Sequence, residues 1–232
     1  MHLYGKYKGK LLVATAQDRN DECSPIAFAI VEGETLEAWD YFLVNIRAHV
    51  TEMSNICLIS DNHRSIISAV ENNRNWLPPN AYHVFCIRHI ASNFNQKFRN
   101  EDLKRTLKNL GYTPAMVDFE RGLARFRETS PQIAEWIDAI PKEKWSRAYV
   151  VERRRYMHMT TNLAESVNTV LKGARNIPIT ALIKHTYSRL VHYFVTRGTS
   201  VDISIRIPNQ VFEHHTKSIQ ILTGKKVYNG YK

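Results

Sequence analysis

The chain has 232 residues, of which 44% are hydrophobic and 23% are charged, and its formal net charge is +10. This composition suits a globular protein with a sizeable core, and because no apolar run is long enough to span a bilayer, a membrane protein is not expected. The three scattered cysteines exclude a disulfide framework and favour a reducing intracellular compartment, and no apolar segment near the start indicates a signal peptide.

The positive charge is concentrated in the later part of the chain. Residues 1–96 hold 8 Lys and Arg against 10 Asp and Glu, whereas residues 97–175 hold 16 against 10 and residues 176–232 hold 8 against 2. A positive field over the later segments favours a polyanion as partner. Basic character alone is weak support, since many basic proteins bind no nucleic acid specifically.

The first hundred residues predict an alternation of strands and helices. Two β-rich runs, 11–16 and 23–31, flank a polar connector and predict an antiparallel hairpin. Thr35 is a candidate N-cap for a helix to about residue 50. A buried strand at 56–60, a helix at 65–73, a strand at 82–85 and a helix at 86–98 follow, which is an α/β order.

From residue 101 to about residue 156 the hydrophobic periodicity is helical only. Three apolar stripes predict three helices, the first ending at Gly111 and the third stopped by Pro141. The expected domains are a first part of the core at 1–100, an all-helical insertion at 101–158, core helices at 159–198 and a C-terminal extension at 199–232. One core helix carries Glu165, another spans about residues 180–196, and the end of the chain from Gly224 resembles a frayed tail.

Asp61 directly follows the predicted strand at 56–60. In open α/β sheets, sites form just beyond the carboxyl ends of such strands, so Asp61 has the position of a catalytic or metal-binding acid. Asp is also a common N-cap, and Asp61 could simply cap the following helix. Both interpretations stay open at this point.

A hairpin, a strand ending in Asp and a later helix bearing Glu suggest a ribonuclease-H-like fold. Five stretches also occur in order over most of residues 4–175: GKYKGKLLVATA (5–16), PIAFAIV (25–31), ISD (59–61), HVFCIRHI (83–90) and TNLAESVN (161–168). Together they resemble the catalytic region of plant Mutator-like (MULE) transposases. The resemblance implies an α/β, ribonuclease-H-like core of the DDE transposase and integrase type.

The resemblance also implies a metal-dependent chemistry. Two Asp and one Glu of the family hold a pair of divalent ions, Mg²⁺ or Mn²⁺, which activate water or a 3′-hydroxyl for attack on a DNA phosphodiester. Asp61 matches the second Asp and Glu165 matches the Glu, 104 positions later. Carboxylates suit this role because Mg²⁺ is a hard ion that prefers oxygen ligands.

The first Asp of the family has no match. It belongs to a D-G-T-x-L run that ends the strand before the glycine-rich loop, and only Met1 to Tyr4 precede that loop here. We therefore expect an N-terminally truncated core. Asp18 and Asp21 are poor substitutes, because the hairpin turn places them more than about 20 Å away. We predict a remnant with little or no transposase activity.

Cys86 and His89 match the C-x2-H motif of the family. Their spacing suits a metal pair, but zinc needs four ligands and no second Cys pair is present. The conceivable partners are His83, His185, His192, His214 and His215. The alternative is a buried Cys86 with His89 in a hydrogen bond near the site.

Several residues near the expected carboxyl end of the sheet are candidate DNA contacts. Lys6, Lys8, Lys10, His63, Arg64 and Arg88 could bind phosphates, and Tyr4 and Tyr7 could stack on bases. The alternative is a set of ordinary solvated side chains. The four Trp residues are expected in the core or at domain contacts.

Three functions stay open. The first is a transposase-derived domain for DNA recombination that is catalytically impaired. The second is a domesticated, non-enzymatic DNA- or protein-binding module, related to the far-red-response transcription factors of the same family. The third is an active transposase completed by residues outside the chain. DNA is the expected partner, a homo-oligomer is an open alternative, no membrane is expected, and the family favours the nucleus.

Overall fold

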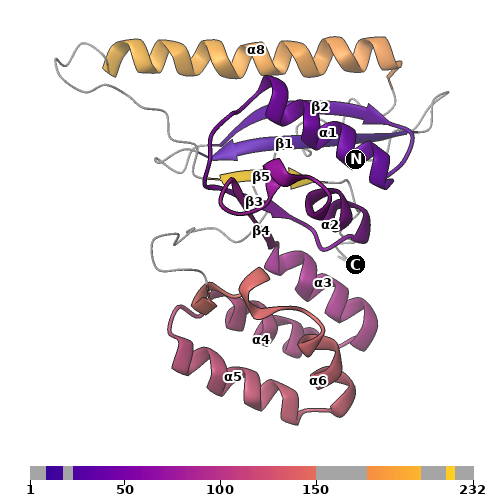
Figure 1. The fold of residues 1–232 in the computed structure, drawn as a ribbon, viewed down its shortest axis with the longest axis vertical. Helices are drawn as coiled ribbons and strands as arrows, with labels where there is room; N and C mark the ends of the chain where they lie inside the picture. The colour runs from indigo at the N-terminus through magenta and orange to yellow at the C-terminus, as the bar shows by residue number, and fades with distance from the viewer. Residues whose placement is uncertain (1–8, 18–22, 150–176, 205–217, 223–232) are drawn as a thin grey trace.

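The computed structural model describes residues 9–17, 23–149, 177–204 and 218–222. These residues form a mixed α/β structure around one five-stranded sheet (Figure 1). The strands lie in the order β2-β1-β5-β3-β4. Their bounds are β1 Lys10–Gln17, β2 Cys23–Val31, β3 Ile56–Ser60, β4 Ala81–Phe85 and β5 Ser218–Leu222. The predicted α/β class is confirmed.

The hairpin and the buried strand are present as the sequence predicts. β1 and β2 pair antiparallel from Lys10↔Val31 to Gln17↔Cys23, with one irregularity after Ala14. β3 pairs with β4 in parallel, and all five residues of β3 are buried. A continuous apolar run is typical of a parallel strand covered on both faces, which explains the composition of β3.

β5 was not predicted. It comes from the segment expected as a C-terminal extension, yet it lies in the middle of the sheet, between β1 and β3. It pairs antiparallel with β1 and parallel with β3. The hairpin and the β3–β4 pair are therefore hydrogen-bonded into one sheet through β5.

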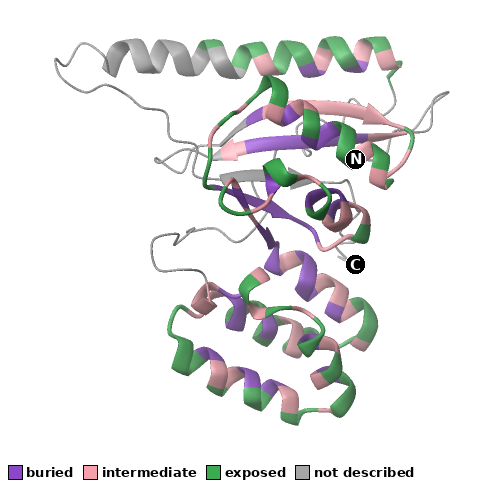
Figure 2. Ribbon diagram, in the orientation of Figure 1, coloured by how far each residue is buried: buried purple, intermediate pink, exposed green. Residues whose placement is uncertain are grey.

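One face of the sheet is covered by α1 (Leu36–His49) and α2 (Arg64–Glu71). Thr35 caps α1 as predicted, since its hydroxyl accepts the Ala38 N–H at 3.2 Å. The core on this face includes Trp39 and Trp76, which have no exposed surface. Figure 2 shows how the buried residues gather on β1, β3 and β4 and on the inward sides of the helices.

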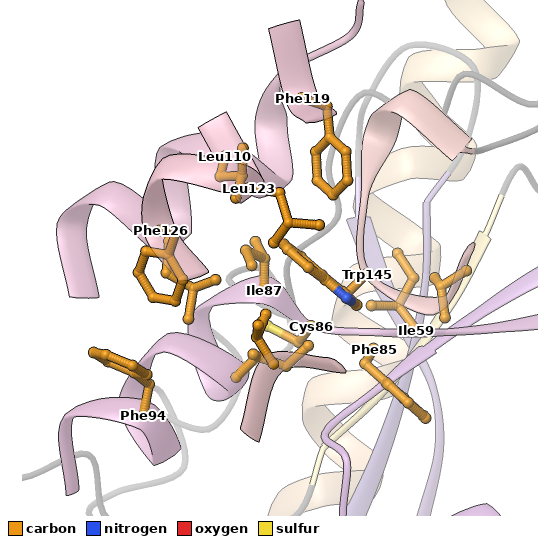
Figure 3. Close-up of a cluster of buried hydrophobic side chains, with 14 of the residues drawn as sticks. Ile59, Phe85, Cys86, Ile87, Phe94, Leu110, Phe119, Leu123, Phe126 and Trp145 are labelled. Carbon is orange, nitrogen blue, oxygen red and sulfur yellow. The ribbon is translucent and has the colours of Figure 1, made fainter. Parts of the chain in front are cut away.

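The segment directly after β4 is helical, and its elements are α3 (Ile87–Phe98), α4 (Glu101–Tyr112), α5 (Met116–Glu128) and α6 (Pro131–Asp138). Short 3-10 turns, η2 (Lys142–Lys144) and η3 (Arg147–Tyr149), follow. Figure 3 shows their shared core, in which Phe119 packs on Trp145 and the cluster extends to Ile59 of β3. Side chains before and after residue 100 thus share one hydrophobic core.

Gly111 does not end α4 as predicted. The helix continues to Tyr112, and Gly111 is buried inside its last turn. A Cβ atom at this position would lie 2.6 Å from both Cδ1 and Cγ1 of Ile87, so the glycine is explained by the close approach of α4 to α3.

The long helix α8 (Ile179–Ser204) extends further than predicted and runs along the β2 side of the sheet (Figure 1). Leu182 contacts the apolar cluster of Leu11 and Val13 on the second sheet face. Across the described ranges, no helix combines the length and apolarity needed to cross a membrane. The Trp prediction is also confirmed, because Trp39, Trp76 and Trp145 are fully buried and Trp136 is packed against the core.

Candidate functional site

Asp61 stands at the carboxyl end of β3, at the first position of a three-residue connection to α2. Its residue surface is only 4% exposed. β3 is a central strand, so the position of Asp61 is set by the pairing of its neighbours and not by a loose loop. A carboxylate at this place is typical of sites in open α/β sheets.

The interpretation of Asp61 as an N-cap is wrong. The N-cap of α2 is His63, whose Nδ1 accepts the Ser65 N–H at 3.4 Å. Asp61 instead accepts the His63 N–H at Oδ1, at 3.1 Å. The carboxylate therefore orders the turn that precedes the helix and leaves the capping to His63.

A buried hydrogen-bond chain lies directly behind Asp61. The Ser60 hydroxyl donates to the Asp61 carbonyl oxygen at 2.6 Å, and Ser60 Oγ lies 2.7 Å from His83 Nε2. Because the hydroxyl proton is used toward Asp61, His83 must donate from Nε2 to Ser60. The backbone at Asp61 is therefore linked to β4 through two side chains.

His83 is neutral in this arrangement. Burial, together with the positive charge of Lys144, lowers the pKa of His83 to about 3. Its ring also makes an edge-on contact with Phe85, with centroids 5.2 Å apart. A neutral imidazole with Nε2–H facing Ser60 suits a positioning role and cannot bind a metal through that nitrogen.

Two further hydrogen bonds connect this loop to α3. The Cys86 N–H donates to the Ser60 carbonyl oxygen at 2.7 Å. The Asn93 side-chain amide donates to Asn62 Oδ1 at 2.7 Å. These two bonds attach the end of β3 and the connection after it to the start and the middle of α3, which favours a fixed Asp61 carboxylate.

Cys86 and His89 lie at the start of α3, and both are buried. Among the residues that the structure describes, no three His, Cys, Asp or Glu side chains are grouped to hold a metal ion. Of the proposed zinc partners, His83 is engaged with Ser60. His214 and His215 lie outside the described residues, so the zinc site stays a prediction.

The candidate phosphate contacts are only partly brought together. Lys10 lies at the same end of the sheet as Asp61, but its Nζ pairs with Glu34 Oε1 at 2.9 Å. Arg64 is exposed, whereas His63 and Arg88 are half-buried. Glu165, Lys6 and Lys8 lie outside the described residues, as do Asp18 and Asp21.

Sequence reasoning missed the roles of Ser60 and His83. The signal in the sequence was a polar residue at the end of the apolar run Ile56–Ile59, and a His inside the short strand β4. Neither residue could be paired with the other without the register Ser60↔Phe85, which brings the two strand ends together.

Comparison with known proteins places the first part of the chain. A family model, the MULE transposase domain, matches residues 1–93. Residues 1–93 are a MULE transposase-related domain. The matched part includes Asp61, Cys86 and His89, and it ends before the helical segment 101–149 and before Glu165. No curated protein matches the chain.

The match supports a transposase-derived function for this domain in general terms. Transposases of this family act on DNA and generally depend on divalent metal ions. Within the described part of the domain, the residue best suited to bind such an ion is Asp61, because it is a buried carboxylate at the end of a central strand.

Proposed function

We propose that the chain is a transposase-derived, ribonuclease-H-like DNA-processing domain in which Asp61 is a metal-binding carboxylate of the DDE type. The observation that carries this proposal is the position of Asp61, 4% exposed at the end of a central parallel strand inside a MULE-related segment. An antiparallel hairpin and a parallel strand pair within one sheet agree with the fold that the resemblance implies.

The donor set fits a hard divalent ion in part. The Asp61 carboxylate offers oxygen ligands, which Mg²⁺ and Mn²⁺ prefer, and Glu165 is the second residue that the resemblance assigns to the same ion pair. Bound there, the ions would polarise a phosphodiester and activate the attacking hydroxyl or water. The contribution of Asp61 is to hold its oxygens in one orientation, through the His63 N–H and the Ser60–His83 chain behind it.

We further propose that these 232 residues support little or no strand transfer. The resemblance requires a first Asp at the end of the strand that precedes the glycine-rich loop. In the structure, β5 lies next to β3 on the side away from β4. Neither β5 nor the next four residues, Thr223 to Lys226, contains Asp or Glu. The neighbouring strand therefore completes the sheet without adding a carboxylate.

DNA is the proposed partner. Support comes from the net charge of +10 and from exposed Arg64, which follows the Asp61 loop. The salt bridge to Glu34 makes Lys10 a weaker candidate for a phosphate contact. A nuclear location belongs to the same proposal, because the substrate of the family is chromosomal DNA.

The test is a comparison of DNA nicking and strand transfer in Mg²⁺ or Mn²⁺ by the full chain, Asp61→Ala and Glu165→Ala. Asp40→Ala, an exposed carboxylate on α1, is the matched control. DNA binding is measured on the same samples at low and high salt. We expect salt-sensitive DNA binding in all four proteins and cleavage close to background.

Three results would change the proposal. Robust cleavage that both Asp61→Ala and Glu165→Ala abolish would support the metal site and contradict the low activity. Cleavage that survives both substitutions would contradict the metal-binding role of Asp61 and Glu165, and a chain with no salt-sensitive DNA binding would overturn the assignment of DNA as partner. Binding without cleavage is also the result expected of a domesticated DNA-binding module. A Mn²⁺ titration separates the two functions, because Asp61→Ala lowers the Mn²⁺ affinity only of a metal-binding domain.

A further inference from the structure

β5 is the last described strand of the chain, yet it lies between two strand pairs formed by the first 85 residues. Its partners on β1 run from Gln17↔Ser218 to Val13↔Leu222. Its partners on β3 are Cys57↔Ser218, Leu58↔Ile219 and Ile59↔Gln220. β1 and β3 are not paired with each other. The space between them is therefore a channel one strand wide.

The direction of β5 brings its end to the candidate site. β5 runs parallel to β3, so continuing the register beyond Ile59↔Gln220 sets Ile221 beside Ser60 and Leu222 beside Asp61. On the other side, Leu222 is the partner of Val13 in β1. The carboxyl end of β5 thus lies next to the residue at which β3 ends.

An empty channel would be unfavourable. Ile56 to Ser60 and Leu11 to Thr15 are buried with β5 in place, and both strands pair with β5. Without β5, the two neighbouring strands would each lose a ladder of main-chain hydrogen bonds and expose apolar surface to water. The end of β3, including the Asp61 loop, then loses the hydrogen-bonded neighbour that fixes its position.

We propose that the channel between β1 and β3 is a strand-binding site, that its ligand is the segment Ser218–Leu222 of the same chain, and that its occupation positions Asp61. The importance of Asp61 rests on the proposed function, whereas the docking of the strand does not. Docking and ordering of the loop are coupled, so anything that holds β5 in the channel also orders Asp61.

A cross-link tests the docking in the full chain. Cys57 and Ser218 are Cα partners on adjacent strands, a spacing of about 4.8 Å that a disulfide can bridge. Mild oxidation of Ser218→Cys should therefore give an intrachain disulfide between Cys57 and the introduced cysteine, seen by peptide mapping. Gln220→Cys is the matched control, because two residues along the strand put its Cα about 8 Å from that of Cys57, beyond disulfide reach.

Hydrogen exchange tests the coupling. The reporters are the His63 and Cys86 amides, which donate to Asp61 Oδ1 and to the Ser60 carbonyl oxygen. We expect oxidised Ser218→Cys to slow both amides relative to its reduced form. Ile221→Pro, which removes an N–H from the strand, should speed them about tenfold, whereas Ile221→Val should not. Amides of α5 are the internal reference.

The outcomes separate cleanly. An intrachain bond together with the shifted exchange of His63 and Cys86 supports the proposal. Absence of the bond, or a covalent dimer in its place, overturns the assignment of the ligand to the same chain. A bond without any change at the two amides overturns the positioning of Asp61. A docked, protected strand in a chain that binds neither metal nor DNA would contradict the proposed function alone.

Discussion

Ser60 and His83 share a buried hydrogen bond of 2.7 Å between neighbouring parallel strands, directly before Asp61. The Ser60 hydroxyl donates in turn to the Asp61 carbonyl oxygen, at 2.6 Å. The geometry requires a proton on His83 Nε2, and burial keeps the ring neutral by lowering its pKa to about 3. The strand end that carries the candidate carboxylate is therefore supported by a polar chain that depends on the Nε2–H of His83.

The first prediction concerns acid. The folded pKa of His83 is lowered to about 3, whereas the unfolded side chain titrates near its ordinary value of 6.5. The unfolded state therefore binds the proton first as pH falls, and the stabilising contribution, complete above 6.5, is lost progressively down to about 3. We expect the protonation of His83 in the unfolded state to lower the free energy of unfolding by about 2 kcal/mol between pH 7 and pH 5.

The measurement is urea denaturation at several pH values, for the native chain and for His83→Gln. The amide of Gln can still donate to Ser60 but does not titrate. The native chain should lose more stability than the variant between pH 7 and pH 5. Equal slopes for the two proteins would show that His83 is not a buried neutral imidazole.

The second prediction concerns Ser60→Ala. The substitution leaves the buried His83 donor without its acceptor and removes the bond to the Asp61 carbonyl oxygen, so we expect a loss of about 1–3 kcal/mol. A double-mutant cycle with His83→Leu isolates the pair, because Ser60→Ala should cost less where no donor is left unpaired. Identical costs in the two backgrounds would argue against the hydrogen bond.

The third prediction concerns the guanidinium of Arg47, which connects α1 to the segments that precede β3 and β4. Its nitrogens donate to the carbonyl oxygens of Met53 at 2.6 Å and Asn80 at 3.2 Å, and it stacks 4.4 Å from the Trp76 ring centroid. Arg47→Lys cannot keep both bonds and the stacking, so we expect a loss of about 1–2 kcal/mol. Thermal unfolding measures the stability of both variants. Arg74→Lys, at an exposed residue, should change the free energy of unfolding by no more than about 0.5 kcal/mol.

The fourth prediction concerns Gly111→Ala. Alanine favours the helix by about 1 kcal/mol, but its Cβ would lie 2.6 Å from two atoms of fully buried Ile87, and such overpacking typically costs about 1–3 kcal/mol. We expect net destabilisation, partly relieved in the Ile87→Val background, which lacks Cδ1. A stabilised Gly111→Ala protein would show that α3 and α4 separate without cost.

Local patterns predicted the elements of the first hundred residues well. The hairpin, the Thr35 cap and the buried strand before Asp61 each depend on neighbours within a few residues, so the sequence carries the signal. Gly111 shows the limit of such signals. A glycine near the end of a periodic stretch predicts a stop, whereas here it is required by a side chain of another helix.

The pairing of distant segments could not be predicted in this way. β5 has five residues, and nothing in its own composition indicates that its partners lie near residues 13–17 and 57–59. The same holds for His83, a conceivable zinc ligand by sequence and a hydrogen-bond partner of Ser60 in the structure. Register between strands depends on the whole sheet, and a local pattern does not contain it.

The most direct test of the central claim is a Mn²⁺ titration of the native chain, Asp61→Asn and the control Asp40→Asn, followed by electron paramagnetic resonance of the unbound ion. Asn keeps the size of the side chain and removes its charge, and circular dichroism checks that each protein is folded. We expect saturable binding by the native chain and by Asp40→Asn, and binding at least about tenfold weaker in Asp61→Asn. Equal Mn²⁺ affinity in all three proteins would contradict the assignment of Asp61 as a metal ligand.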